Sequence, residues 1–411
     1  MKTLLKDDLL LVILLYLLAI SPVLYFWEAF QSITMIGCSA ILLTKIRRAS
    51  LKINTFNLPF IAVSVILSVL YLYYFSSKSL SLLANTSLLF AIPLCSNYLY
   101  QSQTFLNHKT RILLSFCGSA GLLSFYTIVF YLIDIPNHNF NWYFARFNIE
   151  NHLHIHGTYL SLWMSVALLI LANIWITSTA KTTIKNLFYS FVSMVFVAGL
   201  LIVNSRMMLY TMLILGVLLY YFYTIKNKQV GFSKKNVLIL FITFFAVLVL
   251  SQRYWDDVIF LFENKLASSS RYTINYCSLQ TISDSFLLGT NPNTLQNQLN
   301  NCYDQYGFSE LSKENINAHN QYLDYFLKGG VLLFVAFVTI LFTKLRLAYQ
   351  KQNYLYFSVT LLFCFAFLTE NILVRQYGIY CYFLCDVLLL GTIIPNKSHD
   401  TNEIKESQGG N

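Results

Sequence analysis

Three basic side chains stand at positions where insertion into a membrane gives no reason for them. Arg206 lies between two apolar runs with almost no connection to carry it, and charges at membrane depth usually face a pathway or a partner. Arg271 follows a run of serines at the expected start of a helix, where hydroxyls and free amides could hold an anion. His319 precedes another apolar run, and histidine is well suited to proton exchange near neutral pH. These residue types would suit an anion site and a general base.

Each of these residues also has a purely structural explanation. Arg206 could be an interfacial cation that reaches water, Arg271 an ordinary solvated arginine, and His319 a loop residue that caps the next helix. Glu370 and Arg375 lie in the expected last outer turn. They could form an ion pair that anchors this turn, or Glu370 could orient a catalytic group or hold a second acceptor. Chemistry is favoured only if the fold brings these residues together.

A metal or a nucleotide cofactor is not predicted. His152, His154 and His156 form a cluster, but their spacing supplies no third or fourth ligand from elsewhere in the chain. The sequence contains no Asp-x-Asp pair that would hold a divalent cation on a sugar diphosphate. It also lacks the Gly-rich loop that cradles nucleotide phosphates, so we expect no energy input from nucleotide hydrolysis.

The composition is that of a polytopic membrane protein. Of the 411 residues, 56% are hydrophobic and only 11% are charged, far below the share in soluble domains. The formal net charge of +10 could suggest a nucleic-acid partner, but the basic residues lie in short connections between apolar runs. We therefore expect no nucleic-acid binding. Asp7 and Asp8 precede the first run, and no cleavage site follows it, so this run is expected to be retained.

Apolar runs of near-spanning length predict an all-α fold with about twelve transmembrane helices. The runs are Leu9–Trp27, Phe30–Thr44, Phe56–Phe75, Leu80–Leu99, Ile112–Ile133, Gly157–Ile176, Leu187–Asn204, Met207–Thr224, Val237–Ser251, Tyr322–Thr343, Tyr354–Thr369 and Gly378–Ile394. With the N-terminus inside, 19 of the 28 basic residues, Lys344 among them, fall on the inner side. This bias predicts that both ends lie in the cytoplasm.

The predicted organisation follows from these runs. Residues 1–251 carry helices one to nine, 252–320 form a large periplasmic helical loop, 321–395 carry helices ten to twelve, and 396–411 form a disordered cytoplasmic tail. In the loop, Arg271–Leu288 has the pattern of an amphipathic helix that stops at Gly289, and Thr294–Tyr303 could form another. Cys277 and Cys302 share this loop, where a disulfide is possible in an oxidising periplasm.

Polar motifs at the expected outer ends of helices follow a fixed order from about His152 onward. They are His156-Gly157-Thr158-Tyr159-Leu160, Ser205-Arg206, the Arg271-led helix running into Gly289, His319-Asn320 with Tyr322-Leu323 and Gly330, and Glu370. This ordered set resembles the O-antigen ligase superfamily, which includes O-antigen ligases and related polysaccharide polymerases. The resemblance implies a C-type glycosyltransferase architecture in the bacterial inner membrane, with an active site that faces the periplasm.

The resemblance further implies a donor saccharide carried on undecaprenyl pyrophosphate. Arg206 and Arg271 would bind the pyrophosphate and stabilise the charge that grows on it, so that two arginines replace a metal. His319 would take the proton from the acceptor hydroxyl, with inversion at the anomeric carbon. Glu370 would orient the acceptor or the histidine. The remaining residues expected to contact substrate are Arg375, Asn320, His156 and Tyr322.

Two activities stay open within this superfamily. A ligase attaches polymer to a lipid A–core acceptor, whereas a polymerase extends one lipid-linked saccharide onto another. The donor chemistry is the same in both, and the moderate size of Gln252–His319 favours the ligase. In either case the partners are a lipid-linked donor, a saccharide acceptor and membrane lipids. A secondary transporter or flippase is the alternative of another class, but the paired repeats and charged midplane helices typical of transporters are not evident.

Overall fold

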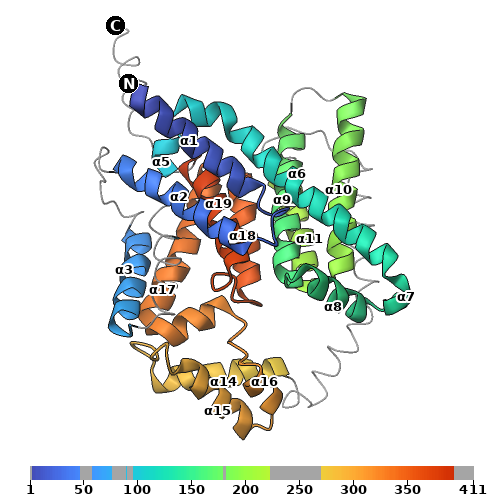
Figure 1. Cartoon of the computed structure of the whole chain (residues 1–411). Helices are drawn as coiled ribbons and strands as arrows, with labels where there is room; N and C mark the ends of the chain where they lie inside the picture. The colour runs from blue at the N-terminus through green and yellow to red at the C-terminus, as the bar shows by residue number, and fades with distance from the viewer. Residues whose placement is uncertain are drawn as a thin grey trace.

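The computed structural model describes residues 2–46, 58–75, 89, 96–178, 182–222 and 270–392. In these ranges every regular element is a helix, which confirms the predicted all-α class (Figure 1). The helices are α1 (Lys2–Ala19), α2 (Glu28–Ile46), α3 (Leu58–Tyr73), α5 (Ser96–Leu99), α6 (Gln103–Ile133), α7 (Ile135–His138), α8 (Trp142–Leu153), α9 (Gly157–Thr177), α10 (Thr183–Val203), α11 (Arg206–Tyr221), α14 (Ser270–Asp284), α15 (Leu295–Gln305), α16 (Ser309–Lys313), α17 (Gln321–Gln350), α18 (Tyr354–Phe367) and α19 (Gln376–Leu389), followed by the 3₁₀ turn η4 (Leu390–Thr392).

Apolar helices of near-spanning length dominate the described chain. By length and composition α6, α9, α10 and α17 could each cross a membrane, and shorter apolar helices include α2, α3, α11 and α18. The expected run Val237–Ser251 and most of Leu80–Leu99 lie outside the described residues. The chain is therefore a helical membrane protein, whereas the count of twelve spans and the periplasmic location of residues 252–320 stay predictions.

Several expected runs have different boundaries in the structure, and local sequence explains two of these differences. The run Leu9–Trp27 was expected as one helix, but α1 ends at Ala19 and turns follow. Pro22 explains the stop, because proline lacks an N–H and disfavours helical backbone at the residue before it. In contrast, α6 begins at Gln103, well before the expected start at Ile112. The Ser102 hydroxyl caps this start by accepting from the backbone N–H of Phe105 at 3.4 Å.

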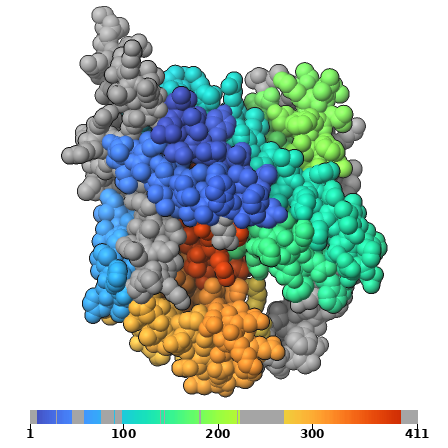
Figure 2. Space-filling model, in the orientation of Figure 1, coloured from blue at the N-terminus to red at the C-terminus, as the bar shows by residue number. Residues whose placement is uncertain are grey.

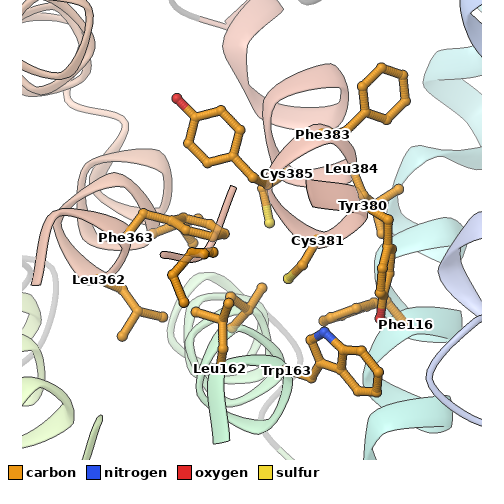
Figure 3. Packing of buried hydrophobic residues seen from close by; sticks show 14 of the residues in the cluster. Phe116, Leu162, Trp163, Leu362, Phe363, Tyr380, Cys381, Phe383, Leu384 and Cys385 are labelled. Carbon is orange, nitrogen blue, oxygen red and sulfur yellow. The ribbon is translucent and has the colours of Figure 1, made fainter. Parts of the chain in front are cut away.

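The core of the bundle is built around α19. Nearly every residue of this helix is buried, and its contacts come from α1, α2, α9 and α18. Figure 3 shows Tyr380, Cys381 and Cys385 of α19 facing Trp163 of α9 and Phe363 of α18. A helix that is apolar on all sides has to be covered by lipid or by other helices, and in α19 other helices supply this cover.

A buried ion pair joins the last helices at the end of the bundle away from α14–α16. Lys344 of α17 donates to Asp386 of α19 and, at 2.6 Å, to the Tyr382 hydroxyl; Tyr356 of α18 donates to Asp386 at 2.8 Å. From the sequence we expected Lys344 in an inner connection. This prediction is wrong, because α17 continues to Gln350 and Lys344 is fully buried within it. Removing one partner of such a pair costs about 3–5 kcal/mol.

Helices α14, α15 and α16 form a small layer, here called the cap, against one end of the bundle (Figures 1 and 2). A disulfide between Cys277 and Cys302 joins α14 to α15. The cap has its own apolar core, in which Ile274 and Leu299 pack with Leu327 from the start of α17. This core makes α14 part of a rigid unit, so the position of the cap determines the position of Arg271.

The cap is attached to the bundle through backbone contacts at a break in α17. Gly329 and Gly330 have non-helical conformations, and Gly330 has a positive φ of 61°. A Cβ atom on Gly330 would overlap the Leu287 carbonyl, and one on Gly289 (φ 76°) would overlap the backbone at residues 328–330. Only glycine allows this close approach.

Backbone hydrogen bonds cross the same junction and set the end of α14. The N–H of Val331 donates to the Phe286 carbonyl at 2.9 Å, and the N–H of Thr290 donates to the Leu327 carbonyl at 2.6 Å. The predicted helix Arg271–Leu288 is therefore too long, because residues 285–290 direct backbone groups to α17 after α14 ends at Asp284. The second predicted helix, Thr294–Tyr303, agrees with α15 to within two residues.

We predict that Gly330→Ala separates the cap from the bundle, whereas Gly307→Ala leaves it attached. Both glycines have positive φ, but only Gly330 has backbone atoms in the space that a Cβ would take. Gly307→Ala should cost about 1 kcal/mol from backbone strain alone. Gly330→Ala should cost roughly 3 kcal/mol, because overpacking adds to the strain. Thermal unfolding of the purified proteins measures the loss of stability, and limited proteolysis measures the separation of the cap. Equal effects of the two substitutions would contradict the proposed junction.

Candidate active site

A cavity of about 490 Å³ opens between the cap and the end of the bundle. Its lining is polar and rich in cationic side chains. The lining residues are Arg146, His156, Thr158, Ser205, Arg206, Met207, Arg271, His319, Thr369 and Glu370. Residues separated by more than 200 positions along the chain thus meet at one site, which is the geometry that joint chemistry requires.

Several helices begin at this cavity. Thr158 lies in the first turn of α9, Arg206 is the first residue of α11, and Arg271 lies in the first turn of α14. His319 lies two residues before α17. The free N–H groups and the positive end of the dipole of each helix are therefore near the cavity, where they add to the charge of the arginines. An anion is the ligand that this environment favours.

A tight connection determines the position of Arg206. Asn204 ends α10 with a positive φ of 50°, a conformation that asparagine tolerates better than most residues. Ser205 is buried and precedes α11, so the chain reverses direction in two residues. Arg206 is exposed at the cavity. The sequence Asn204-Ser205-Arg206 thus explains how a cation with almost no loop around it is held at a helix mouth.

His319 and Glu370 form a hydrogen-bonded pair in the cavity wall. The His319 Nδ1 atom lies 3.1 Å from Glu370 Oε1 and 3.3 Å from Oε2. Burial raises the pKa of Glu370, but the hydrogen bond from His319 and the nearby charge of His156 outweigh it, so this pKa is lower than that of an ordinary glutamate. An ionised Glu370 accepts a proton from Nδ1, so in the neutral tautomer of His319 that this hydrogen bond favours, Nε2 is the acceptor.

A polar network behind the cavity holds the turn that carries Glu370. The Gln321 side chain accepts from the N–H of Leu373 at 2.7 Å, and the N–H of Asn371 donates to Glu370 at 3.2 Å. Lys328 donates to Asp324 at 2.7 Å, one turn further along α17. The contact between Gln321 and Leu373 joins the start of α17 to the turn after α18. The separation of His319 from Glu370 is therefore fixed by the fold.

Arg146 is a lining residue that the sequence analysis did not single out. Its Nε donates to Glu150 Oε1 at 2.7 Å, and the N–H of Gly157 donates to the same oxygen at 2.7 Å. Glu150 thus fixes the direction of Arg146 and ties α8 to the start of α9. The signal available was weak, because a basic and an acidic residue four positions apart are typical of any solvated helix.

The other residues expected to contact substrate have different positions. Asn320 caps α17 by accepting from the N–H groups of Tyr322 and Leu323, and the Tyr322 hydroxyl donates to the Cys364 carbonyl at 3.0 Å. Arg375 is exposed and does not line the cavity. Glu370, which the sequence suggested as its ion-pair partner, pairs with His319. His156 lines the cavity and caps α9.

The histidine cluster is dispersed. The His152 ring stacks on Phe130 and lies 2.7 Å from the Tyr126 hydroxyl, whereas His154 is exposed and has a positive φ of 53°. Within the described ranges, no group of three His, Cys, Asp or Glu side chains is close enough together to hold a metal ion.

Comparison with known proteins agrees with the resemblance noted in the sequence. Residues 190–338 match the family model described as O-Antigen ligase, which supports assignment of the chain to the O-antigen ligase superfamily. The matched segment includes Arg206, Arg271, His319 and both glycines of the α17 break. A search of curated proteins gives no match.

We predict a pH-dependent contribution of Glu370 to stability. Its pKa is lowered in the folded state, so the ionised carboxylate stabilises the fold at any pH above the ordinary glutamate value. Wild type should therefore be more stable than Glu370→Gln near neutral pH. The difference should disappear as the pH falls through the lowered pKa and the carboxylate becomes protonated.

Thermal unfolding of both proteins between about pH 7 and pH 3.5 measures this difference. Glu310→Gln removes an exposed carboxylate from the cap and controls for the loss of a negative charge. A stability difference between wild type and Glu370→Gln that stays constant with pH would show that ionisation of Glu370 beside His319 does not stabilise the fold.

Proposed function

We propose that this chain, whose residues 190–338 match the O-antigen ligase family, transfers a saccharide from a lipid pyrophosphate carrier to an acceptor hydroxyl. The observation that carries the proposal is the single cavity in which Arg206 and Arg271 face the His319–Glu370 pair. We propose undecaprenyl pyrophosphate as the carrier and the lipid A–core as the acceptor. The site would lie at the periplasmic face of the inner membrane, where the lipid of the donor can remain in the bilayer.

The donor pyrophosphate would bind between the arginines. Guanidinium groups form paired, charge-assisted hydrogen bonds with phosphate oxygens, and the starts of α9, α11 and α14 add N–H donors and positive dipole ends. Arg206 and Arg271 lie in the first turns of α11 and α14, beside these N–H donors, so they are our candidates for the phosphates. The cavity also lies between the cap and the bundle, which gives a lipid-linked ligand a wall on each side.

The chemistry would be an inverting displacement. Nε2 of His319 takes the proton from the acceptor hydroxyl while that oxygen attacks the anomeric carbon. The bond between this carbon and the pyrophosphate oxygen breaks, and its electron pair remains on the pyrophosphate. Arg206 and Arg271 stabilise this new negative charge. Glu370 holds the histidine ring in orientation and stabilises the imidazolium that forms.

A strain that lacks the protein separates the two possible acceptors. If the chain is a ligase, its loss leaves long lipid-linked polymer and bare lipid A–core. Loss of a polymerase would instead leave core capped by single repeats. We expect long lipid-linked polymer and bare core. Core capped by single repeats would instead show that the acceptor is a lipid-linked saccharide, and the proposed donor chemistry would stay the same.

We predict that Arg206→Gln and Arg271→Gln each lower kcat roughly 10²–10³-fold, because each removes a donor to the leaving group. The lysine variants should recover only part of this loss, since an ammonium group keeps the charge but cannot form paired hydrogen bonds. The rate of saccharide transfer from purified lipid-linked donor by each purified variant measures these changes in kcat. Arg111→Gln, an exposed arginine of α6 that does not line the cavity, should retain wild-type activity. Loss of activity on addition of a metal chelator would contradict the two-arginine account.

We also predict that His319→Ala lowers kcat roughly 10²–10⁴-fold, the usual contribution of a general base. Glu370→Gln should have a smaller effect, because it leaves the base in place but weakens its orientation. His154→Ala is the matched control, since His154 is exposed near the same end of the bundle and does not line the cavity. Near-normal turnover by His319→Ala, with an unchanged dependence of rate on pH, would remove His319 from the proposed mechanism.

A further inference from the structure

The cap has a second cavity, of about 440 Å³, between α14 and α15. Its lining consists almost entirely of side chains with amide and hydroxyl groups, together with one carboxylate and one disulfide sulfur, and it includes no cation. The lining residues are Gln280, Thr281, Asp284, Ser285, Thr290, Asn291, Thr294, Gln298, Asn301, Cys302 and Gln305. This composition differs from that of the first cavity, and it favours a neutral ligand with many hydroxyl groups over an anion.

Much of the hydrogen-bonding capacity in this groove is available. Gln298, Asn301 and Gln305 are exposed on one face of α15, and their side chains form no hydrogen bond with another described residue. Each side-chain amide offers donors and an acceptor, which matches a hydroxyl that both donates and accepts. The disulfide at Cys302 fixes α15 against α14, so these groups are held by a rigid frame.

Exposed tyrosines continue the groove toward the start of α14. Tyr272, Tyr276 and Gln280 are spaced by four residues and therefore lie on one face of the helix. The rings of Tyr272 and Tyr276 are stacked with centroids 6.1 Å apart, and Tyr306 from the end of α15 packs edge-on against Tyr276 at 5.1 Å. All three rings are at least 40% exposed. They offer flat apolar faces beside a polar groove.

This surface begins beside a residue that lines the reaction cavity. Arg271 lines the first cavity, Tyr272 follows it directly, and Asp284 at the other end of α14 lines the second cavity. At 1.5 Å per residue, the distance from Arg271 to Asp284 along the helix is about 20 Å. The face of α14 and α15 therefore leads away from the proposed pyrophosphate site over the length of a short oligosaccharide.

We propose that this face of the cap binds the saccharide chain of the donor as it extends from the reacting end. Sugar rings would pack on Tyr272, Tyr276 and Tyr306, and further units would form hydrogen bonds with the side chains of the groove. This inference rests on the proposed function and adds to it the part of the protein that recognises the polymer. The groove thus gives the cap a role in selecting long donors over single repeats.

Kinetics with donors of two lengths test the proposal. For Asn301→Ala and Tyr276→Ala, the ratio of KM for a long-chain donor to KM for a single-repeat donor should rise roughly five-fold, the effect of about one lost hydrogen bond or ring contact. Tyr276→Phe keeps the ring and should retain the wild-type ratio. Asn297→Ala, on the same helix but outside the groove, is the matched control. An unchanged ratio in both Asn301→Ala and Tyr276→Ala would overturn the proposal.

A binding experiment separates this proposal from the proposed function. Polysaccharide released from its lipid by mild acid should bind to the full-length protein. The variant Arg206→Gln should bind it as well as wild type, although its kcat for transfer falls roughly 10²–10³-fold. Asn301→Ala should weaken this binding roughly five-fold. Failure of wild type to bind the released chain would overturn the groove even if transfer occurs. Binding without any transfer would support the groove and contradict the proposed reaction.

Discussion

The backbone contact between Gly289 and the break at Gly329 and Gly330 is the constraint on which the candidate active site depends. Arg271 belongs to the cap, whereas Arg206, His319 and Glu370 belong to the bundle or to the turns beside it. Only a cap in a fixed position can bring these groups to one cavity. Because the contact is made by backbone atoms at van der Waals distance, it has little freedom to slide, and the disulfide-linked core of the cap transmits this position along α14.

The residues that the sequence identified share one physical property. Arg206, Arg271, His319 and Glu370 are polar groups that stand out because membrane insertion does not need them. Arg146 could not be distinguished in the same way, since with Glu150 it forms a pair that is common on solvated helices. Membership of the helical class and most helix positions also followed from the apolar runs, because about 20 residues are needed to cross a bilayer.

Other features depend on contacts that a sequence does not display. The end of α14 is set by hydrogen bonds to a helix more than 40 residues further along, and no local signal at Asp284 predicts it. Lys344 was assigned to a connection because basic residues usually follow inner helix ends. Its burial becomes understandable only in the structure, where Lys344 donates to Asp386 and to the Tyr382 hydroxyl, and Tyr356 also donates to Asp386. Asn320 and Tyr322 were grouped with the histidine by proximity, yet both have structural hydrogen bonds.

The central place of α19 has a consequence for the order in which the protein is assembled. This helix is the most enclosed of the described helices, yet the ribosome makes residues 376–389 after the other described α-helices. Until it enters, the facing surfaces of α9 and α18, including Trp163, lack their partner. The described helices before it can insert one by one, but their final packing has to wait until α19 is in place. Biogenesis therefore includes an open intermediate, and any factor that retains α19 would hold the whole protein in that state.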